Sequence, residues 1–270
     1  MDLWFSERET ENIKVQWKLA RTLASHQSQY QKIDIVEFVE FGRGLILDGV
    51  IQTTLSDEFI YHEMLAHVPL NTHPNPKTVL VVGGGDGGTV REVLKHNIDS
   101  VDLVEIDGDV VRLCREFLPE LAGGLDDPRV RVHIGDGIEY VRKREAAYDC
   151  VLVDSSDPVG PAVGLFAREF YSDIFRALKP GGLMAAQTES PLFNQDLIRQ
   201  VTKGLRQIFQ DVRFYWANVP TYSIGPWSFA LAGQNIKGVN MSVTSGCRYY
   251  NDAIHQGAFM LPAYFQDLLK

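Results

Sequence analysis

The feature that most constrains the fold is a repeated order of a short apolar strand followed by an amphipathic helix, which begins at residue 79. The pattern occurs four times in succession, over residues 79–96, 100–118, 130–144 and 148–178. Parallel strands are joined by crossover helices, whereas antiparallel strands are joined by short turns. The alternation therefore predicts an α/β fold with a doubly wound parallel sheet.

Further elements follow this repeat. Residues 181–189 have the pattern of a buried strand, and residues 195–209 have that of an amphipathic helix. Strand patterns at residues 212–219 and 227–233 have no helix between them, which predicts an antiparallel edge. The tail from residue 235 has mixed composition, and we predict only a terminal helix there, near residues 263–269.

The first part of the chain has short β-rich segments in place of strand–helix pairs. Gly42 and Gly44 lie between two of these segments, as glycines do in a hairpin turn. This pattern predicts a small antiparallel β domain. A helical pattern then leads into the proline-marked connector at residues 73–77. We expect an N-terminal β-strand domain at residues 1–65 and a larger Rossmann-like domain at residues 66–270.

The first predicted strand of the repeat ends in a glycine-rich loop, GGGDGG, with a carboxylate in its centre. Gly83, Gly85 and Gly88 satisfy the G-x-G-x-x-G pattern of nucleotide sites, between a strand and a helix. Asp86 contradicts a phosphate ligand, because a carboxylate about 4 Å from a phosphate costs roughly 1 to 4 kcal/mol. The same carboxylate favours a cation, unless Asp86 only caps the following helix.

Two more acids stand where parallel strands are predicted to end. Glu105 lies 20 residues after Gly85, the spacing at which an acid accepts hydrogen bonds from ribose hydroxyls. Asp136 is placed to receive an adenine amino group, and either acid could instead cap a helix. With Asp86, they indicate an adenosine that carries a positive charge and no phosphate. Decarboxylated S-adenosylmethionine fits, since the carboxylate of S-adenosylmethionine would be repelled by Asp86.

The fourth strand of the repeat ends in the motif DSSDP, which begins at Asp154 and includes Asp157. An Asx turn with a proline stop would explain this motif alone. Beside a cationic donor, the two acids become candidates for activating an amine acceptor. An alkyl amine is protonated at about pH 7, and removing its proton to free the lone pair costs roughly 4.6 kcal/mol. Asp154 would be the base, Asp157 would hold an ammonium group, and Tyr61, Tyr222 and Trp227 would desolvate the reacting end. A neutral thioether leaves, so the reaction requires no metal.

Composition narrows the class of protein. With 35 acidic and 26 basic residues the formal charge is −9, which disfavours a nucleic-acid partner. The N-terminal residues have neither a signal-peptide pattern nor a membrane-spanning run, so no membrane partner is expected. The 3 cysteines have no disulfide or metal-ligand spacing. We expect a cytoplasmic protein with reduced thiols and no resident metal or cofactor.

Several motifs together resemble the spermidine synthases, a family of polyamine aminopropyltransferases. The resemblance runs from Trp4 to about Gly233 and rests on YHEM, VLVVGGGDGGTVREVLKH, VEIDGDV, IGDG, VDSSDPVGPAVGLF, AQTESP and NVPTY. It implies a Rossmann-like domain of the methyltransferase type, a small N-terminal β domain, and a homodimer or homotetramer. It also implies transfer of an aminopropyl group from decarboxylated S-adenosylmethionine to an amine, by default putrescine.

The resemblance carries roles onto matching residues of this chain. The residues implied to hold methylthioadenosine are Gln31, Glu105, Asp136, Gly137 and Pro161. The residues implied at the amine substrates are Gln52, Tyr61, His62, Asp86, Asp157 and Tyr222. Ser155, in the DSSDP motif, is a further candidate for substrate binding. Asp154 matches the proton acceptor of the family. Without the family pattern, His62 could equally be a polar side chain beside the core.

One loop departs from the family pattern. Many members read PTYPSG before the last strand, whereas this chain reads PTYSIG and has Ser223 and Ile224 in place of proline and serine. That loop belongs to the acceptor pocket of the family, so agmatine, cadaverine, diaminopropane or a triamine remain alternative acceptors.

Three other functions share part of the pattern. A methyltransferase that uses S-adenosylmethionine would share the fold and Glu105, but Asp86 disfavours it, and the NPPY or DPPY motif is lacking. A nicotinamide oxidoreductase would share only the glycine pattern. A catalytically inactive polyamine- or nucleoside-binding regulator would not need both Asp154 and Asp157.

Overall fold

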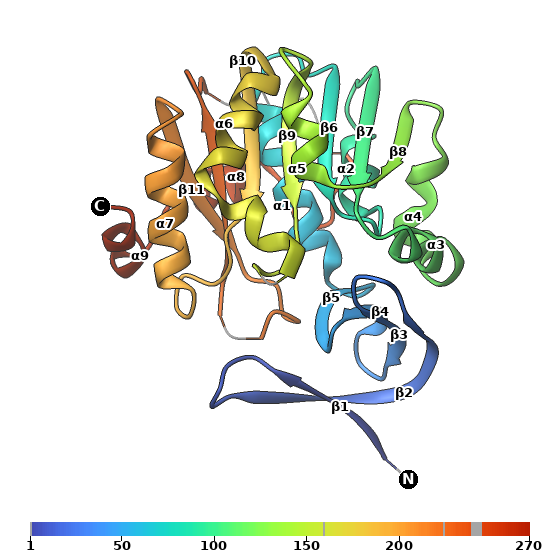
Figure 1. Cartoon of the computed structure of the whole chain (residues 1–270). Coiled ribbons are helices and arrows are strands. Elements are labelled where there is room, and N and C mark those ends of the chain that lie inside the picture. The colour runs from blue at the N-terminus through green and yellow to red at the C-terminus, as the bar shows by residue number, and fades with distance from the viewer. Residues whose placement is uncertain (1, 159, 224, 239–244) are drawn as a thin grey trace.

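The computed structural model describes residues 2–158, 160–223, 225–238 and 245–270, without the side chain of Pro161. Within these residues the strands form two sheets (Figure 1), with orders β1-β2-β3-β4-β5 and β11-β12-β10-β9-β6-β7-β8. The first sheet contains β1 (Leu3–Arg8), β2 (Lys14–Gln27), β3 (Lys32–Phe38), β4 (Gly42–Leu47) and β5 (Val50–Thr54). The second contains β6 (Thr78–Gly83), β7 (Ser100–Glu105), β8 (Val130–Ile134), β9 (Tyr148–Asp154), β10 (Leu178–Gln187), β11 (Asp211–Ala217) and β12 (Trp227–Gly233).

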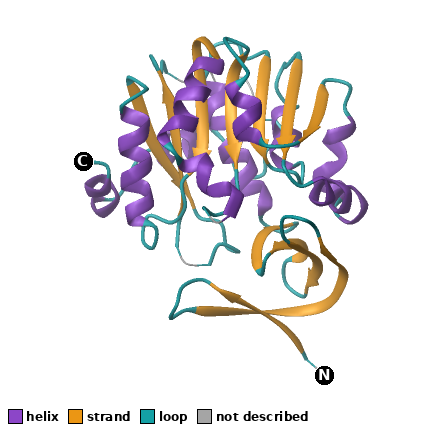
Figure 2. Ribbon diagram, viewed as in Figure 1, coloured by secondary structure: helices purple, strands orange, loops and turns teal. Residues whose placement is uncertain are grey.

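Helices lie on both faces of the larger sheet (Figure 2). They are α1 (Glu58–Thr72), α2 (Gly88–Val93), α3 (Gly108–Phe117), α4 (Pro119–Ala122), α5 (Gly137–Arg142), α6 (Arg168–Ala177), α7 (Gln195–Arg206), α8 (Asp252–Ala258) and α9 (Ala263–Leu268), with 3-10 turns η1 (Gly123–Asp126) and η2 (Gly160–Phe166). Strands β6 to β10 pair in parallel, whereas β12 is antiparallel to both β10 and β11. The predicted doubly wound sheet, its antiparallel edge and the terminal helix are confirmed.

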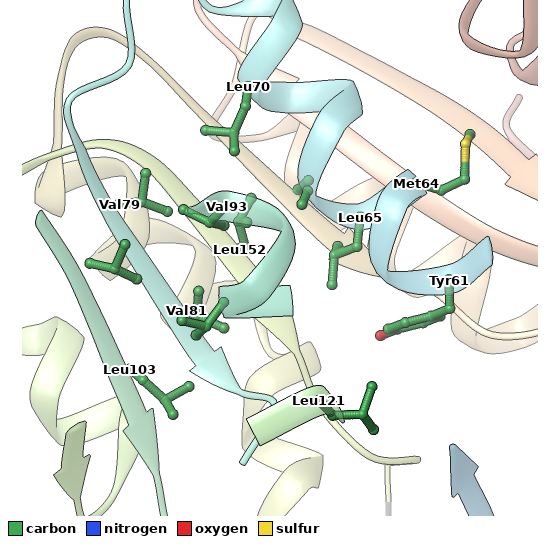
Figure 3. Packing of buried hydrophobic residues seen from close by; sticks show 14 of the residues in the cluster. Tyr61, Met64, Leu65, Leu70, Val79, Val81, Val93, Leu103, Leu121 and Leu152 are labelled. Carbon is green, nitrogen blue, oxygen red and sulfur yellow. The ribbon is translucent and has the colours of Figure 1, made fainter. Parts of the chain in front are cut away.

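Alternate residues of each central strand pack into two different hydrophobic cores. Val79 and Val81 of β6 belong to the core beneath α1, α2 and α3, whereas Leu80 and Val82 belong to the core beneath α5, α6 and α7. Figure 3 shows side chains of α1 and α2 meeting those of β6, β7 and β9 in the first core. Burial on both faces explains why these strands read as uninterrupted apolar runs.

The N-terminal strands form a purely antiparallel sheet, in which β1 and β2 make a long hairpin at one end of the molecule (Figure 1). Ile33, Ile35 and Leu45 of this sheet join the core beneath α1. The expected boundary at residue 65 falls inside α1, and that division of the chain stays a prediction.

The C-terminal segment is fixed to α1 by one buried acid that the sequence did not single out. The Glu63 carboxylate accepts hydrogen bonds from the backbone N–H groups of Arg248, Tyr249 and Tyr250 at 2.7, 2.8 and 2.7 Å. Lys95 Nζ adds a bond to the Gly246 carbonyl at 3.0 Å. Residues 246–258 therefore lie on the α1 side of the sheet, whereas α9 packs against α7 in the core on the other side.

None of the helices in the described ranges is both long enough and apolar enough to cross a membrane.

Candidate active site

A cavity of about 360 Å³ lies at the carboxyl ends of β6, β7 and β9, where parallel sheets place their ligands. A second cavity of about 100 Å³ adjoins it, and Gln52, Tyr61, Ser155, Asp157 and Tyr222 line both. The larger cavity is lined by most of the expected site residues: Gln31, Gln52, Tyr61, His62, Asp86, Glu105, Asp136, Gly137, Asp154, Ser155, Asp157 and Tyr222. Trp227, which was also expected there, lines the smaller cavity. Pro161 lies in η2, and its side chain is outside the described residues.

The glycine loop is required for the close packing of this cavity. Gly83 has φ +81°, and a Cβ added there would lie 2.1 Å from the Asp154 carbonyl oxygen. A Cβ at Gly85 would lie 2.8 Å from Cγ of Glu105. Glycine therefore allows the loop to approach the ends of β7 and β9, which carry these two acids.

Glu105 is anchored by backbone hydrogen bonds. Its Oε2 accepts the N–H of Gly85 at 3.1 Å, and its Oε1 accepts the N–H of Asp107 at 2.9 Å. Burial raises the pKa of the Glu105 carboxyl to about 7, although these bonds favour the ionised form. Gln31 approaches from the N-terminal sheet and is held by a 3.1 Å bond from its Nε2 to Asp107.

Besides lining the cavity, Asp136 is the N-cap of α5, and Asp86 bonds the first N–H of α2 from the position before its N-cap, Gly87. Oδ1 of Asp136 accepts the N–H of Ile138 at 2.8 Å at the start of α5. Oδ1 of Asp86 accepts the N–H of Gly88 at 2.7 Å, which leaves its Oδ2 directed toward His62. The cap and the ligand interpretations of these acids are therefore compatible, because each carboxylate has two oxygens.

Asp154 is held by two hydroxyl groups from different elements. Its Oδ1 accepts the Tyr61 hydroxyl at 2.8 Å, and its Oδ2 accepts the Thr89 hydroxyl at 2.7 Å. Desolvation raises the pKa of the Asp154 carboxyl, the charge of His62 lowers it, and the nearby Asp86 raises it. Thr89 was not predicted from the sequence, although its position in the first turn after the glycine loop was a usable signal.

The smaller cavity is lined by acids from three distant parts of the chain: Glu7 and Glu9 of the N-terminal hairpin, Asp157, and Glu189 after β10. Glu189 has φ +66°, a left-handed conformation that costs about 1 to 3 kcal/mol outside glycine. Burial raises the pKa of both Asp157 and Glu189, and the proximity of Asp157 raises that of Glu189 further. A pocket with this many carboxylates is suited to a cationic ligand.

Polar and aromatic groups complete the smaller cavity. Tyr222 donates its hydroxyl to the Gln52 carbonyl oxygen at 2.7 Å, and its ring lies 4.5 Å from that of Trp227. Among the described residues, Oγ of Ser155 and Nε1 of Trp227 are buried without a hydrogen-bond partner, and both residues line this cavity. Ser223, from the loop that departs from the family pattern, donates its hydroxyl to Glu9. Ile224 lies outside the described residues.

No group of three or more His, Cys, Asp or Glu side chains in the described ranges is arranged to hold a metal ion.

Known proteins are similar to this chain over both of its sheets. Sequence models of a spermine/spermidine synthase domain and a spermidine synthase tetramerisation domain match residues 58–242 and 3–54. A polyamine aminopropyltransferase of Moorella thermoacetica is 51% identical over 99% of this chain and 96% of its own length. One of Bacillus mycoides is 48% identical over 100% of both chains.

Solved structures agree with these relatives. The crystal structure of a spermidine synthase in complex with the transition state analogue AdoDATO superposes with a TM-score of 0.95 at 39% identity, covering 99% of this chain and 94% of that one. The spermidine synthase of Thermotoga maritima superposes with a TM-score of 0.94, with the same identity and coverage.

Proposed function

Because the chain belongs to the spermine/spermidine synthase family of aminopropyltransferases, we propose that it transfers the aminopropyl group of decarboxylated S-adenosylmethionine to putrescine. The products are spermidine and 5'-methylthioadenosine. The observation that carries this proposal is the position of Asp86, a buried acid inside a glycine loop that would otherwise suit a phosphate. The related complex with AdoDATO, a transition state analogue, supports the same chemistry.

The donor occupies the larger cavity in this proposal. Gln31, Glu105, Asp136, Gly137 and Pro161 hold the methylthioadenosine part. Asp86 binds the ammonium group of the aminopropyl arm. This arrangement turns the carbon beside the sulfonium sulfur toward the smaller cavity, which lies beyond Tyr61 and Tyr222.

The acceptor amine occupies the smaller cavity and reacts at Asp154. Its nitrogen attacks the methylene carbon next to sulfur, a carbon–nitrogen bond forms, and the carbon–sulfur pair returns to sulfur as a neutral thioether. The nitrogen gives up one proton, and Asp154 accepts it. Asp157 holds the acceptor in line, and the rings of Tyr61 and Tyr222 exclude water from the reacting nitrogen.

A comparison of several amines tests whether putrescine is the preferred acceptor. Initial rates with putrescine, cadaverine, agmatine, diaminopropane and spermidine, each at subsaturating concentration, rank their kcat/KM values. We expect putrescine to be first. A higher kcat/KM for any other amine would replace putrescine as the acceptor without affecting the donor.

Acceptor binding is expected to release protons near neutral pH. Burial raises the pKa of Glu7 to about 7, so this acid is about half protonated there, and an ammonium group nearby favours its ionised form. Calorimetric titration of putrescine in two buffers of different ionisation enthalpy counts the protons released. Glu7→Gln should release fewer than the wild type, whereas Glu37→Gln, on β3 and outside both cavities, should release the same number. An unchanged count in Glu7→Gln would remove Glu7 from the acceptor pocket.

Ser223 is expected to tighten acceptor binding through Glu9. Removing this hydrogen bond by Ser223→Ala frees Glu9 and should raise the KM for putrescine roughly twofold to tenfold, with no change in the donor KM. Thr10→Ala is the matched control. Thr10 follows Glu9 in the turn between β1 and β2, and its hydroxyl oxygen accepts the N–H of the nearby Asn12. Equal KM values for putrescine in the wild type and Ser223→Ala would contradict this role.

We also propose that the protein is a cytoplasmic homo-oligomer. The match of residues 3–54 to a tetramerisation domain supports a homo-oligomer, which we propose to be a homodimer or a homotetramer. The described cysteines Cys114, Cys150 and Cys247 are all free thiols, which supports a reducing, cytoplasmic location.

A further inference from the structure

A chain of charged side chains leads from Asp86 away from the cavity. Nε2 of His62 lies 3.7 Å from Oδ2 of Asp86, and Nδ1 of His62 lies 2.6 Å from Oε2 of Glu58. Arg91 is the last member of this series: its Nη2 lies 2.8 Å from Oε2 of Glu58, and its Nη1 lies 3.1 Å from Oε1. His62, Glu58 and Asp86 are all buried.

The position of the imidazole ring is fixed by packing. A Cβ added to Gly88 would lie 2.2 Å from Cε1 of His62, so the ring lies directly against the last glycine of the GGGDGG loop. Both ring nitrogens face carboxylate oxygens, and only the protonated imidazolium can donate a proton to each side. This geometry holds the ring in place and favours its protonated form.

The charged groups around the ring come from every element packed against it. Glu58 approaches from α1, Asp86 from the glycine loop and Asp154 from the end of β9, while Arg91 of α2 lies behind Glu58. Burial alone would lower the pKa of His62, but the Asp86 and Glu58 carboxylates raise it well above its ordinary value.

This positive charge matters for the two acids that the proposed reaction uses. Asp86 must be ionised to bind the donor ammonium, and Asp154 must be ionised to accept a proton. The two carboxylates repel each other, since the charge of Asp86 raises the pKa of Asp154. The charge of His62 lowers the pKa of both, so it offsets their repulsion and their burial.

We propose that Glu58, with Arg91 as its counter-ion, is a positioning residue that keeps His62 protonated so that Asp86 and Asp154 remain ionised together. Glu58 lines neither of the two cavities. Its role rests on the proposed function only through the use of Asp86 and Asp154, whereas the protonation of His62 can be measured without any turnover.

The first test is an NMR titration of the histidine side chains in the intact protein, with His62 assigned by comparison with His62→Gln. In the wild type, His62 should keep its proton at about pH 8, where an unperturbed histidine is neutral. In Glu58→Gln, which retains an acceptor for Nδ1 but not its charge, the proton should leave at lower pH. Titration of wild-type His62 near its ordinary pKa would overturn the proposal without any variant.

The second test is the pH profile of kcat/KM. The acidic limb in Glu58→Gln should move to higher pH, because Asp86 and Asp154 lose the nearby positive charge that lowers their pKa values, so that kcat/KM on this limb falls roughly tenfold or more. Glu58→Asp restores the charge and should recover part of this loss. If the limb of the kcat/KM profile lay at the same pH in a folded Glu58→Gln enzyme as in the wild type, the proposal would be overturned.

Glu63→Gln is the matched control. Glu63 is also buried on α1 and also accepts several hydrogen bonds, but these come from the C-terminal segment. The variant should lower the Tm and leave the pH profile and the His62 titration unchanged. A shift of the profile equal to that of Glu58→Gln would show that any buried glutamate of α1 acts alike and would refute the specific role of Glu58. An inactive wild type in which His62 remains protonated would refute the proposed function and leave the Glu58–His62 interaction standing.

Discussion

Replacement of Asp154 by Asn is expected to lower kcat by a factor of about 100 to 10,000, the range over which a positioned general base contributes to a rate. Asn keeps the shape of the side chain: its Oδ1 can accept one of the two hydroxyl groups that hold Asp154, from Tyr61 and Thr89, and its Nδ2 can donate to the other. What it loses is the capacity to take a proton from the attacking nitrogen. Binding of methylthioadenosine, measured by calorimetry, should change little.

Asp149→Asn is the matched control for this prediction. Asp149 lies on the same strand, β9, but at its other end, where it accepts the N–H groups of Lys77 and Thr78 and pairs with Lys179. This variant should lose stability and keep most of its kcat. A decrease of only a few fold in Asp154→Asn would show that another group, or the solvent, accepts the proton.

The second large effect is expected at Asp86, and it concerns the choice of donor. Asp86→Asn retains an oxygen for the N–H of Gly88, and therefore the hydrogen bond at the start of α2, but removes the negative charge. The loss of an ion pair worth about 1 to 4 kcal/mol should lower kcat/KM for decarboxylated S-adenosylmethionine roughly fivefold to several hundredfold. The dissociation constant of S-adenosylmethionine itself should fall, because its carboxylate no longer meets a like charge.

This prediction separates the two interpretations of Asp86. If Asp86 served only as a cap, Asn would replace it with little effect on either ligand. An unchanged ratio of the two donor affinities would therefore reject the selection role and leave the cap. A thermal unfolding curve close to that of the wild type would show that the cap has been preserved.

The order of the strands and helices was predictable because the central strands β6, β7 and β9 are buried on both faces, and helices such as α3, α6 and α7 are buried on one. Val79 to Val82 of β6 distribute between two cores, so the strand reads as a continuous apolar run that ends at a glycine. The acids that follow such strands were predictable for the same reason, since the carboxyl ends of parallel strands meet at one edge. Glu105 and Asp154 illustrate this, because both line the same cavity.

The parts of the site that depend on distant segments could not be predicted in this way. Glu7 lies in an exposed hairpin by local pattern, yet it reaches the same cavity as Asp157, which is far away in sequence. Glu58 and Arg91 belong to different helices, and nothing in either helix indicates that the two side chains meet beside His62. The docking of the C-terminal segment on Glu63 has the same origin, since it consists of backbone donors that any residue supplies.

The most direct test of the account is mass spectrometry of the products that the purified protein forms from putrescine and either decarboxylated S-adenosylmethionine or S-adenosylmethionine. We expect 5'-methylthioadenosine and an amine lengthened by one aminopropyl unit from the decarboxylated donor, and no product from S-adenosylmethionine. No transfer from the decarboxylated donor, together with a methylated product from S-adenosylmethionine, would contradict the role given to Asp86 and the reaction built on it.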